Sequence, residues 1–535
     1  MDKKRILRKQ TIKEAAIISS VIAFLSKIVG YVRDMLTAKY FGTSPQMDAF
    51  EVALIIPNML LGLFATGAQT IIIRLYGEKK EEKKEKILVN QIFFIYSIVL
   101  MLLTLLLILF SPFFVKIVAS GFTSLRLSYA SNFVKVLAIF GYLNVMAGFL
   151  TGVFQAEKQF LYPALTGLIA NIVIPITIVL LTPSIGIYSR VLGQDFFGFV
   201  YFLMLFSFLF FRWKFFRIYN LNNIEWPLIK EFTNLMLPAV VVSGLSVLYQ
   251  IIDKTVASYL PYGAIASLSY AQTVFLIPYS LITLSINAAV YPTLSQHAIS
   301  NNSKSYMHLF KKAFFVLVFV NIPFTVFFVV WAPAIVRVIF QRGAFNEQSA
   351  LLTQANVSMY SLGLLGISLA DLFRRAFFSF KDTKTPMRIS LVSVFLNLVL
   401  DIVFAKFMGA PGIALATTLV TYVSLVQYIL YGKGKNYFER HFINYLAKET
   451  GKGLLSGLVI GILAYFMNFF IPLKEHALKV FFISIGFGAI LFIIYVVIGL
   501  LLKGEMFKIA FNYTLNFLSN VKDSLGGKNE NCNWK

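Results

Sequence analysis

The chain contains 535 residues, of which 58% are hydrophobic and 13% are charged, and its mean hydropathy is +0.77. Soluble globular domains are about 45–50% apolar and about 25% charged, so this composition excludes a soluble enzyme, a disordered protein and a disulfide scaffold. The formal net charge of +24 would indicate nucleic-acid binding in a soluble protein. In so apolar a chain it predicts instead a membrane protein with Lys- and Arg-rich loops on one side, and no nucleic-acid partner.

Cysteine and histidine offer little chemistry. The single cysteine, Cys532, excludes an intrachain disulfide and a cysteine-based zinc site, and the four histidines show no pair at metal-ligand spacing. The basic start precedes an apolar run, but Lys27 and Arg33 follow without a small-residue cleavage site. We therefore expect that the first span is retained. From the scarcity of cysteine and histidine we expect no catalytic residues.

Hydropathy predicts about fourteen membrane-spanning helices, because a span needs about 20 mostly apolar residues. The spans are expected at residues 15–39, 46–73, 88–112, 129–155, 163–183, 191–211, 232–259, 265–292, 313–334, 351–373, 386–406, 411–431, 453–472 and 478–502. The first, second and seventh carry charges or proline inside the apolar run. The expected fold class is an all-α polytopic membrane protein.

The charges between the spans predict the topology. With a cytoplasmic N-terminus, 35 of the 48 Lys and Arg residues lie in inner segments or at the adjoining span ends, 9 lie in outer loops or at their span ends, and four lie deeper within spans. Positive residues concentrate on the cytoplasmic side of membrane proteins. We therefore expect both termini to be cytoplasmic and the number of spans to be even.

Three similarities in constant order predict an internal repeat. The matched pairs are 54–60 with 275–281, 33–41 with 252–260, and 155–163 with 379–386. The first pair places Pro57 and Pro278 221 residues apart. Spans one to six and seven to twelve therefore form two pseudo-symmetric six-helix lobes, an arrangement of transporters that bind substrate between the halves.

The repeat divides the chain into four parts. They are an N-lobe at 1–225, a C-lobe at 226–435, a final helix pair at 436–502 and a cytoplasmic tail at 503–535. Apolar residues in the tail follow helical spacing, at Phe507, Ala510, Phe511, Thr514, Leu518 and Val521. This spacing predicts an amphipathic helix on the inner membrane surface.

Ionisable residues inside spans are costly and are functional hypotheses by default. In the first seven spans the candidates are Lys27, Arg33, Asp34, Asp48, Lys135 and Lys254. In one interpretation, Arg33 and Asp34 pair locally near a helix end and Arg33 reaches water. In the other, the basic residues face a central cavity and bind an anion. Arginine suits phosphate because its planar group donates two hydrogen bonds at once.

The second half offers oxygen atoms for a cation. The residues are Asp253, Asn397, Asp401 and Thr417. Asn397 and Asp401 are four residues apart and share one helix face. Carboxylate, amide and hydroxyl oxygens suit a small hard cation such as Na⁺ or H⁺. The alternative is structural, with Asp253 paired to Lys254 and Asp401 paired to a basic neighbour such as Lys406.

A series of short motifs runs through residues 15–430 in a fixed order. They are S-K-I-V-G-Y-V-R-D-M-L-T-A-K-Y-F-G (26–42), D-A-F (48–50), I-P-N (56–58), L-F-A-T-G-A (63–68), Y-A-Q (270–272), P-T-L-S (292–295), I-V-R-V-I-F-Q-R-G-A-F (335–345), K-D-T-K-T-P (381–386) and G-I-A-L-A-T-T-L (412–419). Together they resemble the MurJ/MviN family of lipid II flippases, within the multidrug/oligosaccharidyl-lipid/polysaccharide exporter superfamily.

The resemblance implies a fold and a mechanism. Fourteen helices form two six-helix lobes and a final pair, and alternating access carries undecaprenyl-linked lipid II while its tail follows a groove at spans thirteen and fourteen. Lys27 (usually Arg), Arg33, Asp34 and Asp48 match functional positions of the family. The resemblance also implies a sodium site at Asp253, Asn397, Asp401, the Ile413 carbonyl and Thr417. We expect a monomer in the bacterial cytoplasmic membrane, with lipid II and membrane lipids as partners and no cofactor besides Na⁺.

Four positions depart from the family pattern. The family usually has two arginines after P-N-L-L, a glutamate just before the glycine, and an arginine after Y-A-D. At the corresponding positions this chain has Leu61, Gly62, Thr66 and Thr273. Either another cation (Lys254, Lys135 or Arg74) substitutes, or the substrate differs from lipid II.

The leading hypothesis is an ion- or potential-coupled flippase for lipid II. The alternatives within transport are an exporter of another lipid-linked oligosaccharide or polysaccharide and a multidrug exporter of the same superfamily. A membrane enzyme would need a carboxylate cluster and a catalytic loop, whereas the outer loops are short and carry few acids. A cell-wall scaffold would leave the intramembrane charges unexplained.

Overall fold

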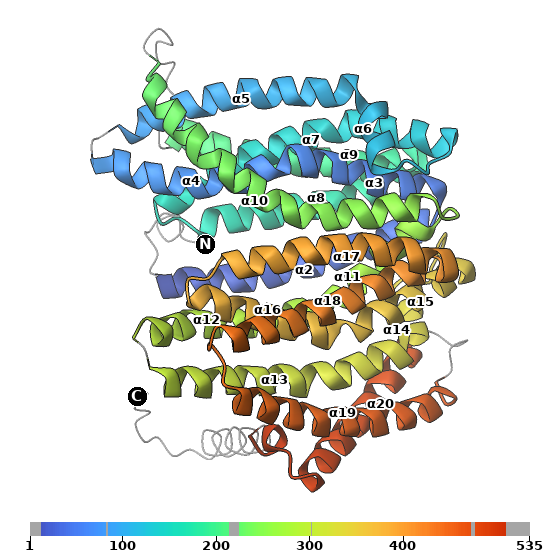
Figure 1. The fold of residues 1–535 in the computed structure, drawn as a ribbon. Helices are drawn as coiled ribbons and strands as arrows, with labels where there is room; N and C mark the ends of the chain where they lie inside the picture. The colour runs from blue at the N-terminus through green and yellow to red at the C-terminus, as the bar shows by residue number, and fades with distance from the viewer. Residues whose placement is uncertain (1–11, 82–83, 213–223, 301, 472–476, 510–535) are drawn as a thin grey trace, which may run out of the picture. The chain divides into compact units, whose positions relative to one another are not determined.

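The computed structural model describes residues 12–81, 84–212, 224–300, 302–471 and 477–509. Across these ranges the regular structure is helical, and no strand occurs (Figure 1). The predicted all-α fold class is confirmed.

The first half of the chain forms a series of long helices with one short helix between them. They are α2 (Ile12–Phe41), α3 (Pro45–Leu60), α4 (Gly62–Glu81), α5 (Glu85–Leu109), α6 (Ser111–Val118), α7 (Ser124–Ala156), α8 (Leu161–Ile185), α9 (Tyr188–Ser207), the π-helical turn η1 (Phe208–Arg212) and α10 (Trp226–Ser258).

The second half has the same character. It contains α11 (Ala264–Pro278), the π-helical turn η3 (Tyr279–Thr283), α12 (Leu284–Ile299), α13 (Ser303–Val330), α14 (Ala332–Ile339), α15 (Glu347–Leu362), α16 (Leu364–Ser379), α17 (Lys384–Met408), α18 (Ala410–Gly434), α19 (Arg440–Asn468) and α20 (Ala477–Leu501).

Ten helices within the described ranges are long and apolar enough to cross a membrane, and the number reaches twelve when each of two bent pairs is one broken span. These pairs are α3 with α4, and α15 with α16, which bend by 42°. The other two predicted spans correspond to α2 and α10, which are 30 and 33 residues long but are not among the ten. Both carry charged residues inside. Fourteen spans therefore remain a prediction.

The chain divides into two compact units. Unit 1 comprises residues 1–270, 340–352 and 398–413, and unit 2 comprises 271–339, 353–397 and 414–535. This division differs from the predicted lobe boundary at 225/226, because α10 packs against α3, α4 and α5.

Helix α7 is the centre of unit 1, where it contacts α3, α4, α5, α6 and α9. Two glycines allow the close approach of its neighbours. A Cβ at Gly141 would lie 2.9 Å from Cβ of Pro57, and one at Gly152 would lie 2.3 Å from Cγ2 of Ile72. Small residues at helix interfaces let backbones pack closely within membranes, so these glycines set the spacing of α3 and α4 on α7.

Unit 2 is built around α13, which contacts α12, α16 and α19. Its interior is aromatic: the ring centroid of Phe310 lies 5.1 Å from that of Phe373 and 4.9 Å from that of Phe438. The indole N–H of Trp331 donates to the backbone oxygen of Ala464 at 3.2 Å, which ties α13 to α19. These contacts form a continuous core for the C-terminal helices.

Matched backbone features support the internal repeat. Pro57 lies inside α3 and Pro278 ends α11, where the π-helical turn begins. The short helices α6 and α14 are both eight residues long and carry proline at the second position. Lys158 and Lys381, which follow α7 and α16, both adopt a φ of 58°, the left-handed conformation that closes a helix C-terminus.

The predicted amphipathic tail lies largely outside the described residues. Within them, Phe507 is fully buried, and its ring centroid lies 4.9 Å from that of Tyr495 and 5.6 Å from that of Phe319. The start of the tail is therefore packed against α20 and α13. The other predicted apolar positions, Ala510, Phe511, Thr514, Leu518 and Val521, fall beyond the described range.

Candidate functional site

The late part of α2 carries the first ion pair of the site. Arg33 Nε donates to Asp34 Oδ1 at 2.8 Å, and the two side chains are 26% and 17% exposed. The local pairing considered from the sequence is therefore present. Arg33 also interacts electrostatically with Glu51 on α3, so it is not confined to its neighbour.

A second ion pair joins α3 to α10. Lys254 Nζ lies 3.3 Å from Glu51 Oε2, and the side chains are 13% and 19% exposed. The hydroxyl of Ser269 donates to the same Glu51 oxygen at 2.7 Å, and Lys254 also donates to that hydroxyl. Glu51 therefore receives two donors from helices far away in the sequence.

Arg190, in the first turn of α9, is a buried cation beside these groups. It is 4% exposed, its guanidinium lies 4.6 Å from the ring centroid of Phe50, and its Nη1 donates to Gln194 Oε1 at 2.9 Å. Its Nε has no hydrogen-bond partner among the described residues. Electrostatic interactions connect it to Arg33, Asp34 and Glu51.

We call Arg33, Asp34, Glu51, Arg190 and Lys254 the charge cluster. It contains three cations and two carboxylates, brought together by α2, α3, α9 and α10 of unit 1. Charged side chains buried within membrane-spanning helices are retained only when they are paired with an opposite charge or serve a function. Because cations exceed carboxylates and Arg190 keeps a spare donor, the arrangement can accept an additional anion.

Asp48 has a different environment from the charge cluster. It is fully buried, and its two carboxylate oxygens accept from the backbone N–H groups of Gly263 at 2.7 Å and Ala266 at 2.8 Å. Arg126 Nη1 lies 3.7 Å away. The carboxylate therefore fixes the start of α11 to the start of α3, as an acceptor at a helix N-terminus does.

The other basic residues that were predicted for the site form no hydrogen bond or ion pair with the charge cluster. Lys27 on α2 is half-buried and Lys135 on α7 is exposed, and neither makes a hydrogen bond or ion pair with any residue the structure describes. Arg74 is exposed and pairs with Glu78 one turn further along α4, at 3.0 Å. Of the cations that could replace the absent arginines, Lys254 alone belongs to the charge cluster.

Two of the five residues predicted for the cation site lie close together in unit 1. Asp253 on α10 and Asp401 on α17 interact electrostatically, and Asp401 is fully buried. The adjacent Lys254 forms its ion pair with Glu51 and also interacts electrostatically with Asp253. Asn397 and Thr417 belong to unit 2, so their part in this site stays a prediction, as does that of Ile413, which is buried in unit 1.

Unit 2 holds a second buried carboxylate that the sequence reasoning did not single out. Asp371 on α16 is 3% exposed and accepts from Asn287 Nδ2 at 2.6 Å and from Arg375 Nε at 3.3 Å. Arg374 also pairs with it. The guanidinium of Arg375 lies 5.9 Å from the ring centroid of Tyr291. This group joins α12 to α16.

Comparison with known proteins relates this geometry to a family. The sequence profile described as "Lipid II flippase MurJ" matches residues 37–483. The chain belongs to this family. It is therefore a multi-pass membrane protein of a transporter family.

Relatives and solved structures agree with this assignment. The "Probable lipid II flippase MurJ" of Buchnera aphidicola subsp. Schizaphis graminum is 26% identical over 482 residues, 84% of this chain and 89% of the relative. The "Lipid II flippase MurJ" of Thermosipho africanus is 27% identical over 418 residues, 78% of this chain and 85% of the relative.

Among solved structures, "Lipid II flippase MurJ, inward closed conformation" has a TM-score of 0.74 and 25% identity, covering 90% of this chain and 98% of that one. An inward-facing multidrug resistance MATE family transporter has a TM-score of 0.65 at 12% identity, covering 81% and 99%. The MATE transporter shares the fold alone.

The positions that depart from the family pattern have ordinary packing roles where the structure describes them. Leu61 is fully buried, and its Cδ1 lies 2.8 Å from where a Cβ of Gly141 would be. Gly62 begins α4 directly after the break. The α3–α4 junction is thus filled by apolar packing against α7 instead of charges.

Two members of the charge cluster were not predicted from the sequence. Glu51 lies three residues after Asp48 on α3, and that i, i+3 spacing in an apolar span was the available signal. Arg190 was counted as an outer-loop residue because the predicted span began at 191. The helix begins at Tyr188, so Arg190 lies within it.

Proposed function

We propose that this protein is a flippase for lipid II, the undecaprenyl-pyrophosphate-linked peptidoglycan precursor. It moves this lipid from the inner to the outer leaflet of the bacterial cytoplasmic membrane by alternating access. The match of residues 37–483 to the lipid II flippase family carries the proposal. A transporter needs no catalytic residue, and we assign none.

The charge cluster is the proposed binding site for the pyrophosphate. In the structure Asp34 and Glu51 supply the negative partners of Arg33 and Lys254. A pyrophosphate can add to this arrangement, because three cations accompany only two carboxylates and Arg190 Nε has no hydrogen-bond partner among the described residues. Arg33 and Arg190 provide the planar donors that phosphate oxygens prefer.

An apolar cavity in unit 2 supports a path for the lipid tail. It has a volume of about 740 Å³ and lies between α13 and α19, with contributions from α16 and α18. Gly457 and Gly461 on α19 face it, together with aliphatic residues such as Ile322 and Leu458. Since α19 begins the predicted tail groove at 436–502, we place part of the polyprenyl chain here.

The pair of Asp253 and Asp401 is the proposed cation site. All the predicted donors are oxygen atoms, which fits Na⁺, and a buried carboxyl pair is stable only with a proton or a cation to offset its charge. No group of three or more His, Cys, Asp or Glu that could hold a metal ion occurs in the described ranges. Asn397, Thr417 and the Ile413 carbonyl would complete the Na⁺ donor set, and the ion would supply positive charge to the carboxyl pair.

Topology and assembly complete the proposal. The distribution of Lys and Arg supports cytoplasmic termini. The protein acts as a monomer, with membrane lipids as its surroundings. The departures at Leu61, Gly62 and Thr273 favour one alternative above the others, which is a different lipid-linked oligosaccharide as the substrate.

Complementation tests this function. In cells depleted of their own lipid II flippase, we expect the wild-type protein to restore growth and Arg33→Ala to fail although it inserts at the same level. Lys116→Ala is the matched control, because Lys116 is an exposed cation on α6 outside the charge cluster, and it should rescue. A wild-type protein that inserts but does not rescue would exclude lipid II and leave another lipid-linked saccharide.

A further inference from the structure

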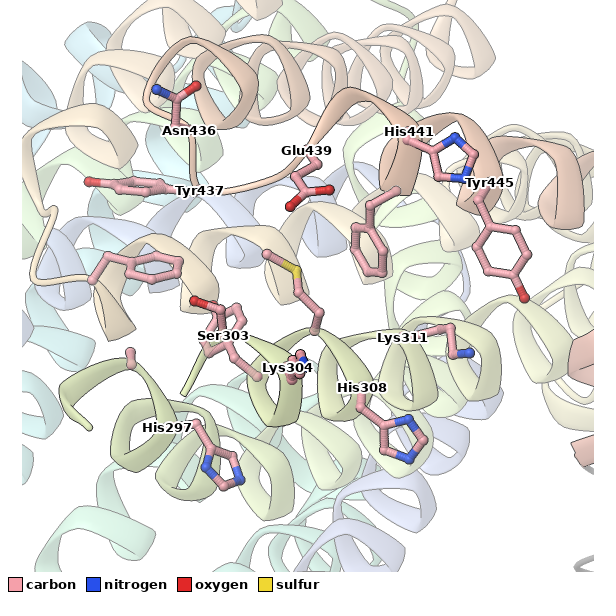
Figure 2. Close-up of a pocket in the computed structure, with 15 residues that line it drawn as sticks. His297, Ser303, Lys304, His308, Lys311, Asn436, Tyr437, Glu439, His441 and Tyr445 are labelled. Atoms are coloured by element: carbon pink, nitrogen blue, oxygen red, sulfur yellow. The ribbon is translucent and has the colours of Figure 1, made fainter. Parts of the chain in front are cut away.

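A cavity of about 590 Å³ opens in unit 2 where several helices end (Figure 2). It lies between the end of α12, the first turns of α13, the residue after α16, the segment that joins α18 to α19 and the first turns of α19. Three of the four histidines of the chain line it: His297, His308 and His441. We call this cavity the rim pocket. None of the residues assigned to the proposed transport function lines it.

Basic side chains outnumber acidic ones in the rim pocket. It is lined by Lys304, Lys311 and the three histidines, and Glu439 is the single carboxylate among the lining residues. Figure 2 shows Lys304 and His308 on α13, with Glu439 coming from the opposite segment. Lys304 and His308 are exposed and make no hydrogen bond or ion pair with the described part of the chain. Both are therefore available to a ligand.

Lys311, the other lysine of the rim pocket, already pairs with a carboxylate. Its Nζ donates to Glu505 Oε1 at 2.9 Å, and it lies 5.6 Å from the ring centroid of Tyr445. Glu505 follows α20, so a carboxylate from a distant part of the chain already occupies one edge of this basic surface. His308 and Lys304, one and two turns earlier on α13, lack such a partner among the described residues.

An aromatic wall gives the pocket a fixed shape. The rings of Tyr437 and Phe380 stack with centroids 4.3 Å apart and an interplanar angle of 15°. Phe380 also contacts Tyr306, at 4.9 Å between centroids. The backbone holds Tyr437 in place, because Asn436 adopts a φ of 56° and the N–H of Tyr437 donates to Gly432 at 2.9 Å. Ligand groups can therefore pack on a preformed surface.

Size and chemistry together restrict the ligand. Cavities of about 300–1,000 Å³ are typical of small-molecule sites, so the pocket exceeds what a single inorganic ion needs. A second cavity of about 540 Å³ shares His297, Lys304 and His308 with it and extends the basic surface along α13. Lysine and histidine donors that converge from two helices suit a group with several acceptor oxygens, as phosphate has.

We propose that the rim pocket binds a phosphate ester, with the phosphate on Lys304, His308 and His297 and its organic substituent against Tyr437 and Phe380. Basic pockets between helices at the cytoplasmic surface bind anionic lipid head groups, and the helix ends that form this pocket are those that the charge distribution places inside. The same chemistry would also take a soluble phosphate compound.

Calorimetric titration of the full-length protein in detergent tests the proposal. The two ligands are dihexanoyl phosphatidylglycerol and glycerol 3-phosphate, a soluble phosphate ester, with dihexanoyl phosphatidylcholine as a phosphodiester without net charge. The variant Lys304→Gln/His308→Gln removes two exposed side chains, and Lys384→Gln is the control, because Lys384 is exposed at the start of α17 and does not line the pocket.

We expect the double variant to bind at least about tenfold more weakly than the wild type, as loss of charge-assisted hydrogen bonds implies, while Lys384→Gln binds normally. Binding of phosphatidylglycerol alone assigns the site to a lipid head group, and binding of glycerol 3-phosphate alone assigns it to a soluble phosphate ester. Equal affinity in the double variant and the control, or no binding of either ligand to the wild type, would overturn the proposal.

Discussion

Charged side chains are arranged differently in the charge cluster of unit 1 and at the rim of unit 2. In the cluster, Glu51 and Lys254 are 19% and 13% exposed and share a hydrogen-bond network with Ser269. At the rim, Lys435 is 41% exposed where it pairs with Asp382, and the neighbouring rim pocket has two lysines and three histidines around one carboxylate.

This difference follows from solvation. Water can stabilise an unpaired charge at a helix end, whereas a charge buried among apolar helices costs several kcal/mol unless a partner lies close. The pairs of unit 1 are therefore needed for stability as well as for binding, and the rim pair is not. Substitutions in the two regions should differ in both size and kind of effect.

The largest expected effect is the loss of transport in the variant Arg190→Met, which changes the charge cluster. Methionine fills a similar volume beside Phe50, leaves the neutral Gln194 without its partner, and leaves two cations for the two carboxylates of the charge cluster. We expect the apparent melting temperature in detergent to change little, since a buried charge is replaced by an apolar group. Loss of two hydrogen bonds to phosphate oxygens should lower transport by about 100-fold, which the complementation assay would report as failure to rescue.

Arg190→Lys provides the control for charge alone. It retains the positive charge but not the planar donor group, so an intermediate rescue is expected. If Arg190→Met rescued growth as well as the wild type does, Arg190 would have a structural role only, and the pyrophosphate site would need to be placed elsewhere.

The second prediction concerns stability. Glu51→Ala leaves Lys254 buried without its carboxylate, which should lower the free energy of unfolding by about 3 kcal/mol. The double variant Glu51→Ala/Lys254→Met removes both charges and should recover most of that loss. Chemical denaturation of the purified variants measures both. Equal instability of the single and double variants would show that the loss comes from packing and not from the unpaired charge.

The helices of this protein could be predicted from sequence to a large extent. Hydropathy located a helix for each of the fourteen predicted spans, because apolar length decides which segments can cross a membrane. It did not predict the break between Leu60 and Gly62 or the π-helical turn after Pro278. These irregularities depend on how α3 packs against Gly141 and on how proline disturbs the helix, which hydropathy averages do not represent.

The charge cluster was predicted less completely. Arg33, Asp34 and Lys254 were identified as costly charges within spans, but Glu51 and Arg190 were not. Contacts such as Glu51 with Lys254, separated by 203 residues, arise only from tertiary packing. The sequence could indicate which charges need a partner, and it could not indicate which partner the fold supplies.

The third prediction tests the cation pair of Asp253 and Asp401. Asp401→Asn removes one ionisable group but keeps a hydrogen-bonding side chain of the same size. If Na⁺ binds at this pair, adding NaCl in place of KCl should raise the melting temperature of the wild type and not that of the variant. At an ion concentration ten times the dissociation constant, the expected stabilisation is about 1.4 kcal/mol. A Na⁺ effect of equal size in Asp401→Asn would contradict the assignment.

The smallest effect is expected from Asp382→Asn, at the rim of unit 2. Asp382 accepts from Lys435 at 2.6 Å and from the backbone N–H and hydroxyl of Thr385 at 3.0 and 2.8 Å. Partial burial acts to raise the pKa of Asp382, but these hydrogen bonds hold it below the ordinary value. The carboxylate therefore contributes stability above the ordinary aspartate pKa, and this contribution is lost as the pH falls through the lowered pKa.

Because Lys435 reaches solvent, we expect Asp382→Asn to destabilise the protein by less than about 1 kcal/mol at pH 7. The difference from the wild type should shrink in high salt, which screens exposed pairs, and in acid, where both proteins lack the charge. The loss in Glu51→Ala should persist in high salt, because the charges there are shielded from ions by the surrounding helices. If both losses respond equally to salt, the cluster of unit 1 is as solvated as the rim, and an anion could then bind there only as weakly as on an exposed surface.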